Sequence, residues 1–364
     1  TMFGGIPNTE IDALQKYWDA FPSLRSDLFK PHADKPYADL KVEDVKTAIE
    51  QNTDVERFTM QFSEAFHGFA DRLHHVLIDN VMQVHELQAQ DEIATDIFHR
   101  LADTPLIDKY AAYQALADHW QAIISDIETI QEEGMDAVRT VETAYKLVKK
   151  NDEDVEVPDG LKGRIIPFEL VQQVRSQADL DAIAALQSRV EAIDGEVEEV
   201  RDSFTEEELE AYCDSEKENA PDKKKITADA KPKADVEAET KAKLKQMVAL
   251  WDEQSKTNKQ IKADRLTLEE KTIQAIEHLT DEEIADFLHR KWIVPVCQGI
   301  NGSLTAVLFA LETAALALSQ KYAVSYHQID DEIAQANEEL SQLVSQLTGD
   351  AFAIKGLEAL IKQQ

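Results

Sequence analysis

The sequence predicts an all-α protein, in which an N-terminal multi-helix domain is followed by a long antiparallel coiled-coil hairpin. Three observations support this fold class. The 364 residues include only 11 glycines and 10 prolines, fewer than a protein built from strands and turns needs. Helix-favouring residues, namely Ala, Leu, Glu, Gln and Lys, dominate the remaining composition. Apolar residues also recur at three- and four-residue spacing through most of the chain, as on one face of a helix.

Residues 1–150 are predicted to form the multi-helix domain. Each expected helix carries an apolar stripe, and several begin at a capping residue or a proline. The expected helices cover residues 9–21, 53–73, 91–102 and 105–130, and Gly134 ends the last pattern. In the second of them Phe58, Phe62, Phe66 and Phe69 share one face, and we interpret these aromatic residues as core.

A metal-like group accompanies that aromatic stripe. His67, Asp71 and His74 share a helix face, with His75 adjacent, so they could present imidazoles and a carboxylate to zinc. The alternative is a solvated polar face opposite the buried aromatic side chains. We favour the solvated face, because the chain has no H-E-x-x-H motif, and we assign no metal ligands.

Residues 151–167 are predicted to form a linker with a short extended segment, because charged residues are combined there with Pro158 and Gly160. Residues 168–364 are predicted to form the coiled-coil hairpin. Its first arm carries apolar residues spaced alternately by three and four, as at the a and d positions of a coiled coil. These residues are Ile183, Leu186, Val190, Ile193, Val197 and Val200.

The second predicted arm runs from residue 303 to about residue 347, and its apolar seam includes Leu311, Leu318, Ile333 and Leu340. A heptad helix of this length needs a partner, and the first arm is the expected antiparallel partner. The apolar residues of both arms are therefore the candidate interaction residues of the chain.

The segment between the two arms mixes several kinds of sequence. Residues at about 205–240 combine charges with Pro221 and Pro232 and offer little to bury, so we expect a mobile charged insertion. A helical pattern returns from about residue 237 to residue 277. Thr280 is expected to cap a further short helix, because acidic residues fill the first turn after it.

The charge of the chain bears on its partners. It carries 71 acidic residues against 38 lysines and arginines, a formal net charge of -33, which disfavours a freestanding nucleic-acid-binding protein. Lys223, Lys224 and Lys225 form a short basic run that could touch a phosphate backbone. We favour a solvated charge run, because its surroundings are acidic.

The glycines and cysteines exclude several kinds of site. No G-x-G sequence occurs, so a P-loop or a dinucleotide-binding loop is not expected. Cys213 and Cys297 lie far apart and form no C-x-x-C pair, which excludes a cysteine zinc site and a disulfide framework. We assign no catalytic, cofactor-binding or metal-binding residues. No apolar stretch of bilayer length and no export signal is expected, so the sequence predicts a cytoplasmic protein without membrane contacts.

Five blocks of the sequence resemble the modification (M) subunit of type I restriction-modification systems, in the part that follows its catalytic domain. The blocks occur in the order of that family. They are GGIPNTEIDALQKYW with FPSLRSDLF (4–18 and 21–29), TPLIDKYAAYQALADHW (104–120), KGRIIPFELV (162–171) and LTDEEIADFLHRKW (279–292).

The resemblance implies an adenine-specific DNA methyltransferase that uses S-adenosylmethionine. In that family two M subunits join one specificity subunit, and a restriction subunit is added for cleavage. The family's catalytic domain also needs a glycine-rich cofactor loop and an Asn-Pro-Pro-aromatic motif, and this sequence contains neither. The chain therefore resembles the C-terminal region of an M subunit without its catalytic half, and it is expected to be inactive alone and to hold no cofactor.

Two functions of different classes remain after this reasoning. In the first, the chain is a non-catalytic assembly region that holds the specificity subunit and positions the methyltransferase domain on DNA, so that it meets DNA only within the complex. In the second, it is an acidic DNA mimic or anti-restriction protein, an alternative that the net charge of -33 suggests.

Overall fold

The computed structural model describes residues 8–30, 39–150, 153–214, 220–321 and 326–345, and these are mostly helical, as the sequence predicts. The chain divides into two compact units. The first contains the residues up to 75, residues 85–121 and the residues from 294 onwards, and the second contains residues 76–84 and 122–293. The division differs from the predicted boundary near residue 150, because the chain passes between the units within a continuous helix.

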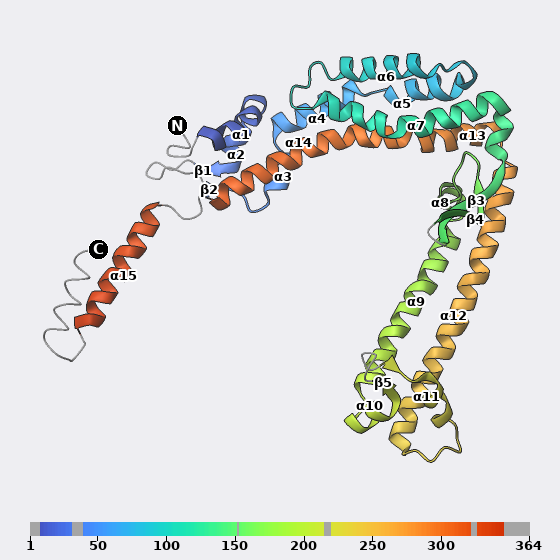
Figure 1. Ribbon diagram of the computed structural model, residues 1–364. Coiled ribbons are helices and arrows are strands. Elements are labelled where there is room, and N and C mark those ends of the chain that lie inside the picture. Colours follow the sequence, from blue (N-terminus) through green and yellow to red (C-terminus); the bar gives the residue numbers. More distant parts are fainter. Residues whose placement is uncertain (1–7, 31–38, 151–152, 215–219, 322–325, 346–364) are drawn as a thin grey trace. The chain divides into compact units, whose positions relative to one another are not determined.

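The first unit contains most of the N-terminal elements and the last two helices (Figure 1). Its elements are α1 (Asn8–Ala20), α2 (Leu24–Leu28), β1 (Phe29–Lys30), β2 (Asp39–Leu40), α3 (Val45–Glu50), α4 (Thr53–Ala65), α5 (Phe69–His74), α6 (Glu86–Arg100), the first half of α7 (Lys109–Glu133), α14 (Val294–Lys321) and α15 (Tyr326–Ser345). Gly68, at a positive φ of 69°, separates α4 from α5 where the sequence predicts one continuous helix.

Helix α14 packs against α1 and α3, and it meets α7 closely. A methyl group added at Gly299 of α14 would lie 2.6 Å from the Cβ atom of Ala115 on α7. Glycine therefore permits this helix contact. The predicted aromatic stripe contributes to the core of the unit, since Phe58, Phe62 and Phe69 are buried.

A polar network connects α2 to the start of α4. Asn52 is 3% exposed, and its side-chain oxygen accepts hydrogen bonds from the first backbone amides of α4. Its side-chain amide donates to Asp27 and Ser23, and the Ser23 hydroxyl donates to Asp54 at 2.7 Å. These bonds to Ser23 lower the pKa of the Asp54 carboxyl. The polar residues of the block at 21–29 thus have a structural role.

The second unit contains a β-hairpin and a pair of long helices. Its elements are η1 (His75–Asp79, from residue 76), η2 (Val81–Gln83), the second half of α7, η3 (Met135–Arg139), β3 (Val141–Lys150), β4 (Glu153–Gly163), α8 (Phe168–Arg175), α9 (Gln177–Asp202), α10 (Glu206–Tyr212), β5 (Cys213–Asp214), β6 (Ala220–Pro221), α11 (Lys223–Asp229), α12 (Ala238–Glu277), α13 (Asp281–Leu288) and η5 (His289–Ile293).

The predicted antiparallel coiled-coil hairpin is present, but its second arm is α12 and not the helix at 303–347. Near the end of α9, Ile193, Val197 and Val200 share a buried cluster with Leu244 and Met247 from the beginning of α12. At the other end Ile183 of α9 clusters with Ile261 and Leu268 of α12. Figure 1 shows the two helices side by side. The predicted partner is wrong because α12 already covers the apolar seam of α9.

The segment predicted as a mobile insertion is ordered where the structure describes it. Thr205 caps α10 in a reciprocal arrangement with Glu208, and the Asp222 carboxylate accepts hydrogen bonds from the first amides of α11. Tyr212 and Ile226 are buried in the same cluster that joins α9 to α12. The prediction fails because these few apolar side chains suffice to dock two short helices onto the end of the hairpin.

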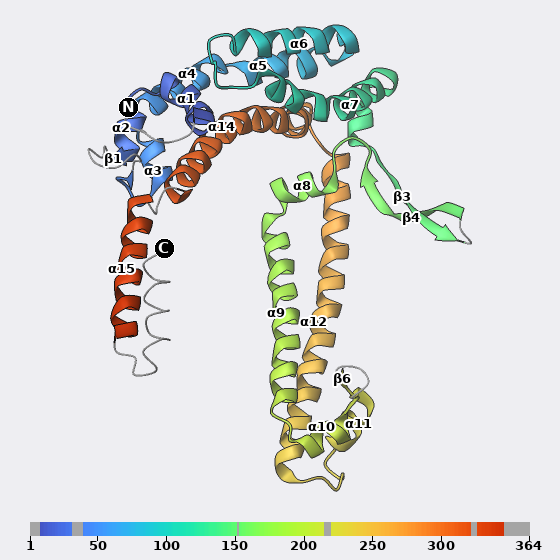
Figure 2. The ribbon, with the colours of Figure 1, turned by 60° about the vertical axis from the view of Figure 1, so that its left-hand side comes forward.

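The predicted linker at 151–167 is also different from the observed structure. Strands β3 and β4 pair antiparallel from Val141 with Gly163 to Lys150 with Glu153, so most of this stretch is one strand of a long β-hairpin. Figure 2 shows the hairpin extending beyond the other elements of the second unit. The predicted extended residues 164–166 form a bend after the strand. Charged and apolar residues alternate at 154–157, which is typical of a strand. The high content of charged residues in this stretch instead favours a linker in the sequence-based prediction.

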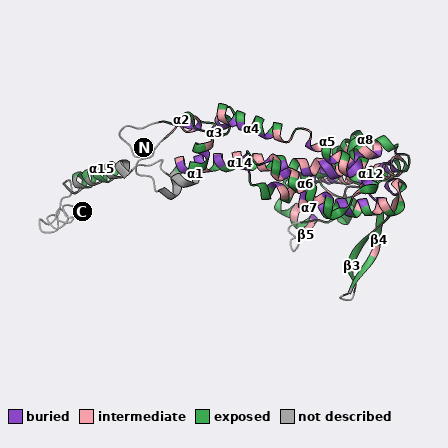
Figure 3. Ribbon diagram, turned by 90° about the horizontal axis from the view of Figure 1, so that it is seen from above, coloured by how far each residue is buried: buried purple, intermediate pink, exposed green. Residues whose placement is uncertain are grey.

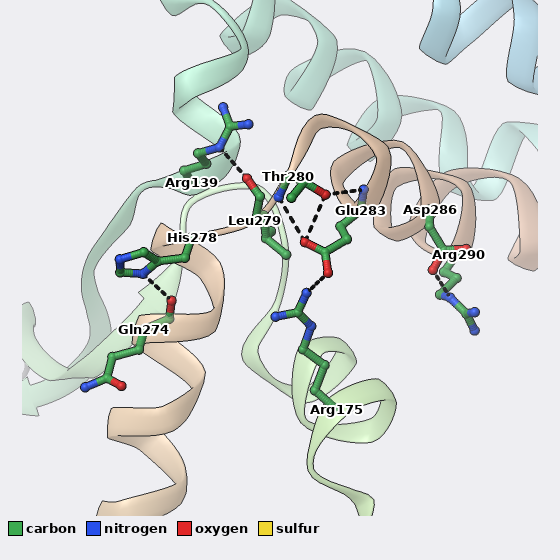
Figure 4. Close-up of polar contacts among 9 residues, drawn as sticks. All are labelled: Arg139, Arg175, Gln274, His278, Leu279, Thr280, Glu283, Asp286 and Arg290. Atoms are coloured by element: carbon green, nitrogen blue, oxygen red, sulfur yellow. Dashed lines mark hydrogen bonds and ion pairs between the residues drawn. The ribbon is translucent and has the colours of Figure 1, made fainter.

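The turn before α13 is held to its surroundings by three charged residues (Figure 4). Thr280 and Glu283 form a capping box, which confirms the predicted helix start. The Arg139 guanidinium donates to the backbone oxygen of Leu279 at 2.7 Å, and Arg175 pairs with Glu283. The block at 279–292 therefore forms a connection between elements of the second unit, with Trp292 1% exposed.

Candidate interaction surfaces

The predicted interaction residues fall into two classes in the structure. Those on α9 lie in the hairpin: Ile183, Ile193, Val197 and Val200 are buried there, and Leu186 and Val190 are half-buried at the same seam. Their apolar surface is already used by α12. These six residues hold the hairpin together and are not carried forward as a surface for a separate partner.

The predicted residues of the second arm lie in the first unit. Leu311 and Leu318 of α14 are buried, at 0% and 8% exposure. Ile333 and Leu340 of α15 are 53% and 44% exposed, and Leu343 is 62% exposed. Figure 3 shows α15 in the colour of exposed residues over its described part. The structure thus separates two core residues from two surface residues that the sequence placed in one seam.

Exposed apolar residues on α15 form a stripe at heptad spacing. Ile333 and Leu340 are seven residues apart, and Leu343 follows three residues later, so all three lie on one side of the helix. Glu338 and Glu339 of the same helix are also exposed. We call Ile333, Leu340 and Leu343 the α15 stripe.

Helix α14 adds further exposed apolar surface. Phe309 is 66% exposed, and Glu312 is the one charged residue between Lys291 and Lys321. The helical stretch Asp281–Gln320 is long and apolar enough to cross a membrane by length and composition, which the sequence analysis did not expect. Only 17% of its most apolar 18-residue window is buried. Core helices of soluble proteins pass the same test, so length and composition alone are weak evidence for a membrane span.

Side chains that could ligate a metal ion or react as a nucleophile are spread through the described residues. No group of three or more His, Cys, Asp or Glu residues in this part of the chain has the arrangement to hold a metal ion. Burial raises the pKa of the thiols of Cys213 and Cys297, which favours the protonated, unreactive form. Cys297 lines a hollow of about 300 Å³ beside Phe66 and Phe69, within the first unit.

A larger hollow lies in the second unit, where β4, α8, α9 and α12 meet. It has a volume of about 990 Å³ and carries both signs of charge, with Lys162 and Arg164 near Glu169 and Asp181. Lys291 borders it, but its ammonium donates to Asp126 and to the backbone oxygen of Ile165. This mixture of charges gives no single ligand chemistry, and we assign no site to it.

Comparison of the chain with protein families, with curated proteins and with solved structures finds no match. A functional interpretation therefore depends on the residues of this chain and on their arrangement. In that arrangement the α15 stripe is the surface with the most evident need of a partner, since its apolar side chains would otherwise remain in water.

Proposed function

We propose that this chain is a non-catalytic assembly region that binds a helical partner through the α15 stripe. The observation that supports the proposal most directly is the exposure of Ile333, Leu340 and Leu343 on one side of an amphipathic helix. A helix with such a stripe typically lays its apolar face against a groove or another helix.

The three side chains of the α15 stripe are large enough to contribute part of the binding free energy of a complex. Fully burying a Leu or Ile side chain yields about 1.5 to 3 kcal/mol, and these three side chains are about half exposed. A few kcal/mol would therefore come from the stripe itself. Because association also has an entropic cost of several kcal/mol, additional surface such as Phe309 on α14 would be needed for a stable complex.

The identity of the partner comes from the sequence resemblance. We propose that the chain is the C-terminal region of a type I modification subunit and that its partner is the specificity subunit. Through that subunit it would join a second modification subunit and the restriction subunit. The blocks at 21–29 and 279–292, which carry much of the resemblance, build the cores of the two units with Leu24, Leu28 and Trp292. They would thus preserve the scaffold that presents α15.

In this proposal the chain performs no chemistry itself. S-adenosylmethionine binding and adenine methylation would belong to a catalytic domain, and the assembly region would position that domain on DNA. Within the complex the chain would lie close to DNA, and the complex would act in the cytoplasm and away from membranes.

The proposal is tested by capture of the cognate specificity subunit on the immobilised chain. We expect Ile333→Asp/Leu340→Asp to lose at least nine tenths of the captured subunit, because two carboxylates would enter an apolar contact. The matched control is Gln335→Asp/Gln342→Asp, which adds the same charge at the same spacing on a different side of α15. Equal capture by both variants would contradict the proposal.

Salt distinguishes the proposed function from the acidic DNA mimic. An apolar helix contact depends weakly on ionic strength, whereas a mimic would bind basic DNA-binding proteins with an affinity that falls steeply as salt rises. We therefore expect capture at 50 mM salt to persist at 500 mM salt. Loss of capture in high salt, together with indifference to the α15 substitutions, would favour the mimic.

A further inference from the structure

The second unit carries a groove whose lining contains no carboxylate. The groove has a volume of about 570 Å³ and runs along α12, with one residue contributed by α11. Its polar lining comes from Lys223 of α11 and from Gln254, Asn258, Lys259, Lys262 and Arg265 of α12, beside the indole of Trp251. In a chain with a net charge of -33, a hollow lined by four cations is a local reversal of charge.

Within the part of the chain that the structure describes, these cations form no ion pair. Among the described residues, the side chains of Lys259, Lys262 and Arg265 have no carboxylate partner, and Lys223 lies over the Trp251 ring at 5.1 Å from its centroid. Many other basic residues of the unit are paired, as Lys271 is with Asp179. The cations of the groove thus remain available for an external anion.

Two carboxylates of α12 near the groove accept hydrogen bonds from side chains of this chain. Glu253 accepts a hydrogen bond from Arg189 of α9 at 2.8 Å, and Asp264 accepts one from Gln260 at 2.8 Å. The hydrogen bond from Arg189 lowers the pKa of Glu253. Of these two carboxylates, Glu253 is paired with the cation Arg189, while the cations of the groove face outward and are exposed.

The spacing of the cations suits a chain of phosphates. Lys259, Lys262 and Arg265 follow one another by three residues, so they advance about 9 Å along the helix axis. Successive phosphates of one strand of duplex DNA advance about 3.4 Å along its axis, so this length matches about three phosphates. Amide side chains such as that of Asn258 are, with Lys and Arg, common donors to phosphate oxygens.

We infer that this groove binds the phosphodiester backbone of a nucleic acid, without reading its base sequence. Lys259, Lys262 and Arg265 would neutralise the phosphates, and Lys223 would extend the cationic surface on α11. The sequence analysis assigned the lysines at 223–225 to a solvated charge run. In the structure α11 places Lys223 beside Trp251 and the cations of α12, which the sequence spacing does not show.

The inference stands apart from the proposed function, because it is argued from the charges of the second unit and not from α15. The two can therefore fail separately. The α15 variants test capture of a protein partner, while the substitutions below are in α12 and test binding of a nucleic acid.

The test is fluorescence anisotropy of a labelled 20-base-pair duplex with the full chain at 50 mM salt. We expect Lys259→Glu/Lys262→Glu to weaken binding at least tenfold. The matched control is Lys245→Glu/Lys256→Glu, two exposed lysines on the same helix outside the groove, which changes the net charge equally and should weaken binding less than threefold. Circular dichroism melting of each variant would show that the hairpin remains folded.

Further measurements distinguish a backbone site from other anion binding. With about three phosphate contacts, affinity should fall about 40-fold between 50 and 200 mM salt, and a duplex of unrelated sequence should bind equally well. Absence of duplex binding by the unsubstituted chain, or equal losses in the two variants, would overturn the inference. Binding of polyglutamate as tightly as the duplex would overturn the assignment to nucleic acid.

Discussion

Helices α9 and α15 carry the same kind of apolar pattern and have opposite fates in the structure. Ile193 of α9 is 0% exposed because α12 covers it, whereas Ile333 of α15 is 53% exposed. Heptad spacing therefore predicts that a helix has a partner, but it does not say whether the partner lies in the same chain. The exposed pattern is the one that indicates an external partner.

The identity of the α9 partner depends on residues that interrupt the α12 seam. Leu244, Met247, Ile261 and Leu268 of α12 face α9, but between the two apolar pairs the Gln254 side-chain amide donates to Asp194 of α9. Such polar residues break the heptad pattern of α12, so the sequence pattern favours the helix at 303–347 as the partner. The observed partner is α12, which lies nearer to α9 along the chain although its apolar spacing is less regular.

The largest expected difference between α9 and α15 is in the loss of stability when an apolar residue of the heptad pattern is replaced by aspartate. Ile193→Asp should lower the free energy of unfolding of the second unit by about 3 to 5 kcal/mol, because an unpaired carboxylate would enter a buried apolar cluster. Ile333→Asp should change stability by less than about 0.5 kcal/mol, since its side chain is already exposed. Urea denaturation followed by circular dichroism measures both. Similar values would erase the distinction between the helices.

A second pair of substitutions compares a packed position of α14 with an open position of the same helix. Gly299→Ala should destabilise the first unit by about 1 to 3 kcal/mol, because the new methyl group would lie 2.6 Å from the Ala115 Cβ atom. Gly302→Ala meets nothing within 4 Å and should stabilise the helix by up to about 1 kcal/mol. Thermal denaturation of the two variants gives the difference. Stabilisation by both would show that α14 does not pack on α7 at Gly299.

An intermediate effect is expected where α10 is attached to the hairpin. The Lys243 ammonium of α12 donates to Glu208 at 3.0 Å and to the backbone oxygen of Ser203 at 2.9 Å, and both charged side chains are mostly buried. Lys243→Met keeps the aliphatic stem but removes these bonds, and it should cost about 1 to 3 kcal/mol. Limited proteolysis should then cut first near residues 205–214. Unchanged stability and cleavage would mean that α10 is held by its apolar contacts alone.

The smallest effect concerns the exposed pair of Arg189 and Glu253 across the hairpin. The hydrogen bond from Arg189 lowers the pKa of Glu253, so this carboxylate stabilises the folded state above its ordinary pKa of about 4.3. That contribution is lost as pH falls through the lower folded-state pKa. The stability difference between the unsubstituted chain and Glu253→Gln should therefore be small near pH 6, smaller still in high salt, and absent at strongly acidic pH. A difference that grows as pH falls would have the wrong sign.

Local signals in the sequence predicted more of this fold than long-range ones. Thr280 and Gly134 were placed correctly at a helix start and a helix end, because capping and a positive φ are properties of a few adjacent residues. The two short helices at 205–240 were missed, since their stability comes from Tyr212 and Ile226 docking on distant residues. The cationic groove was missed for the same reason, because solvated lysines and a ligand-binding set look alike on one helix.

The most direct test of the account is amide hydrogen exchange of the chain, alone and in complex with the specificity subunit. Alone, the amides of α9 and α12 should be strongly protected, and those of α15 should exchange much faster, because its stripe is exposed. On binding, protection should increase in α15 around Ile333 and Leu340 and stay unchanged in α9. Protection that increases in α9 and not in α15 would contradict the account.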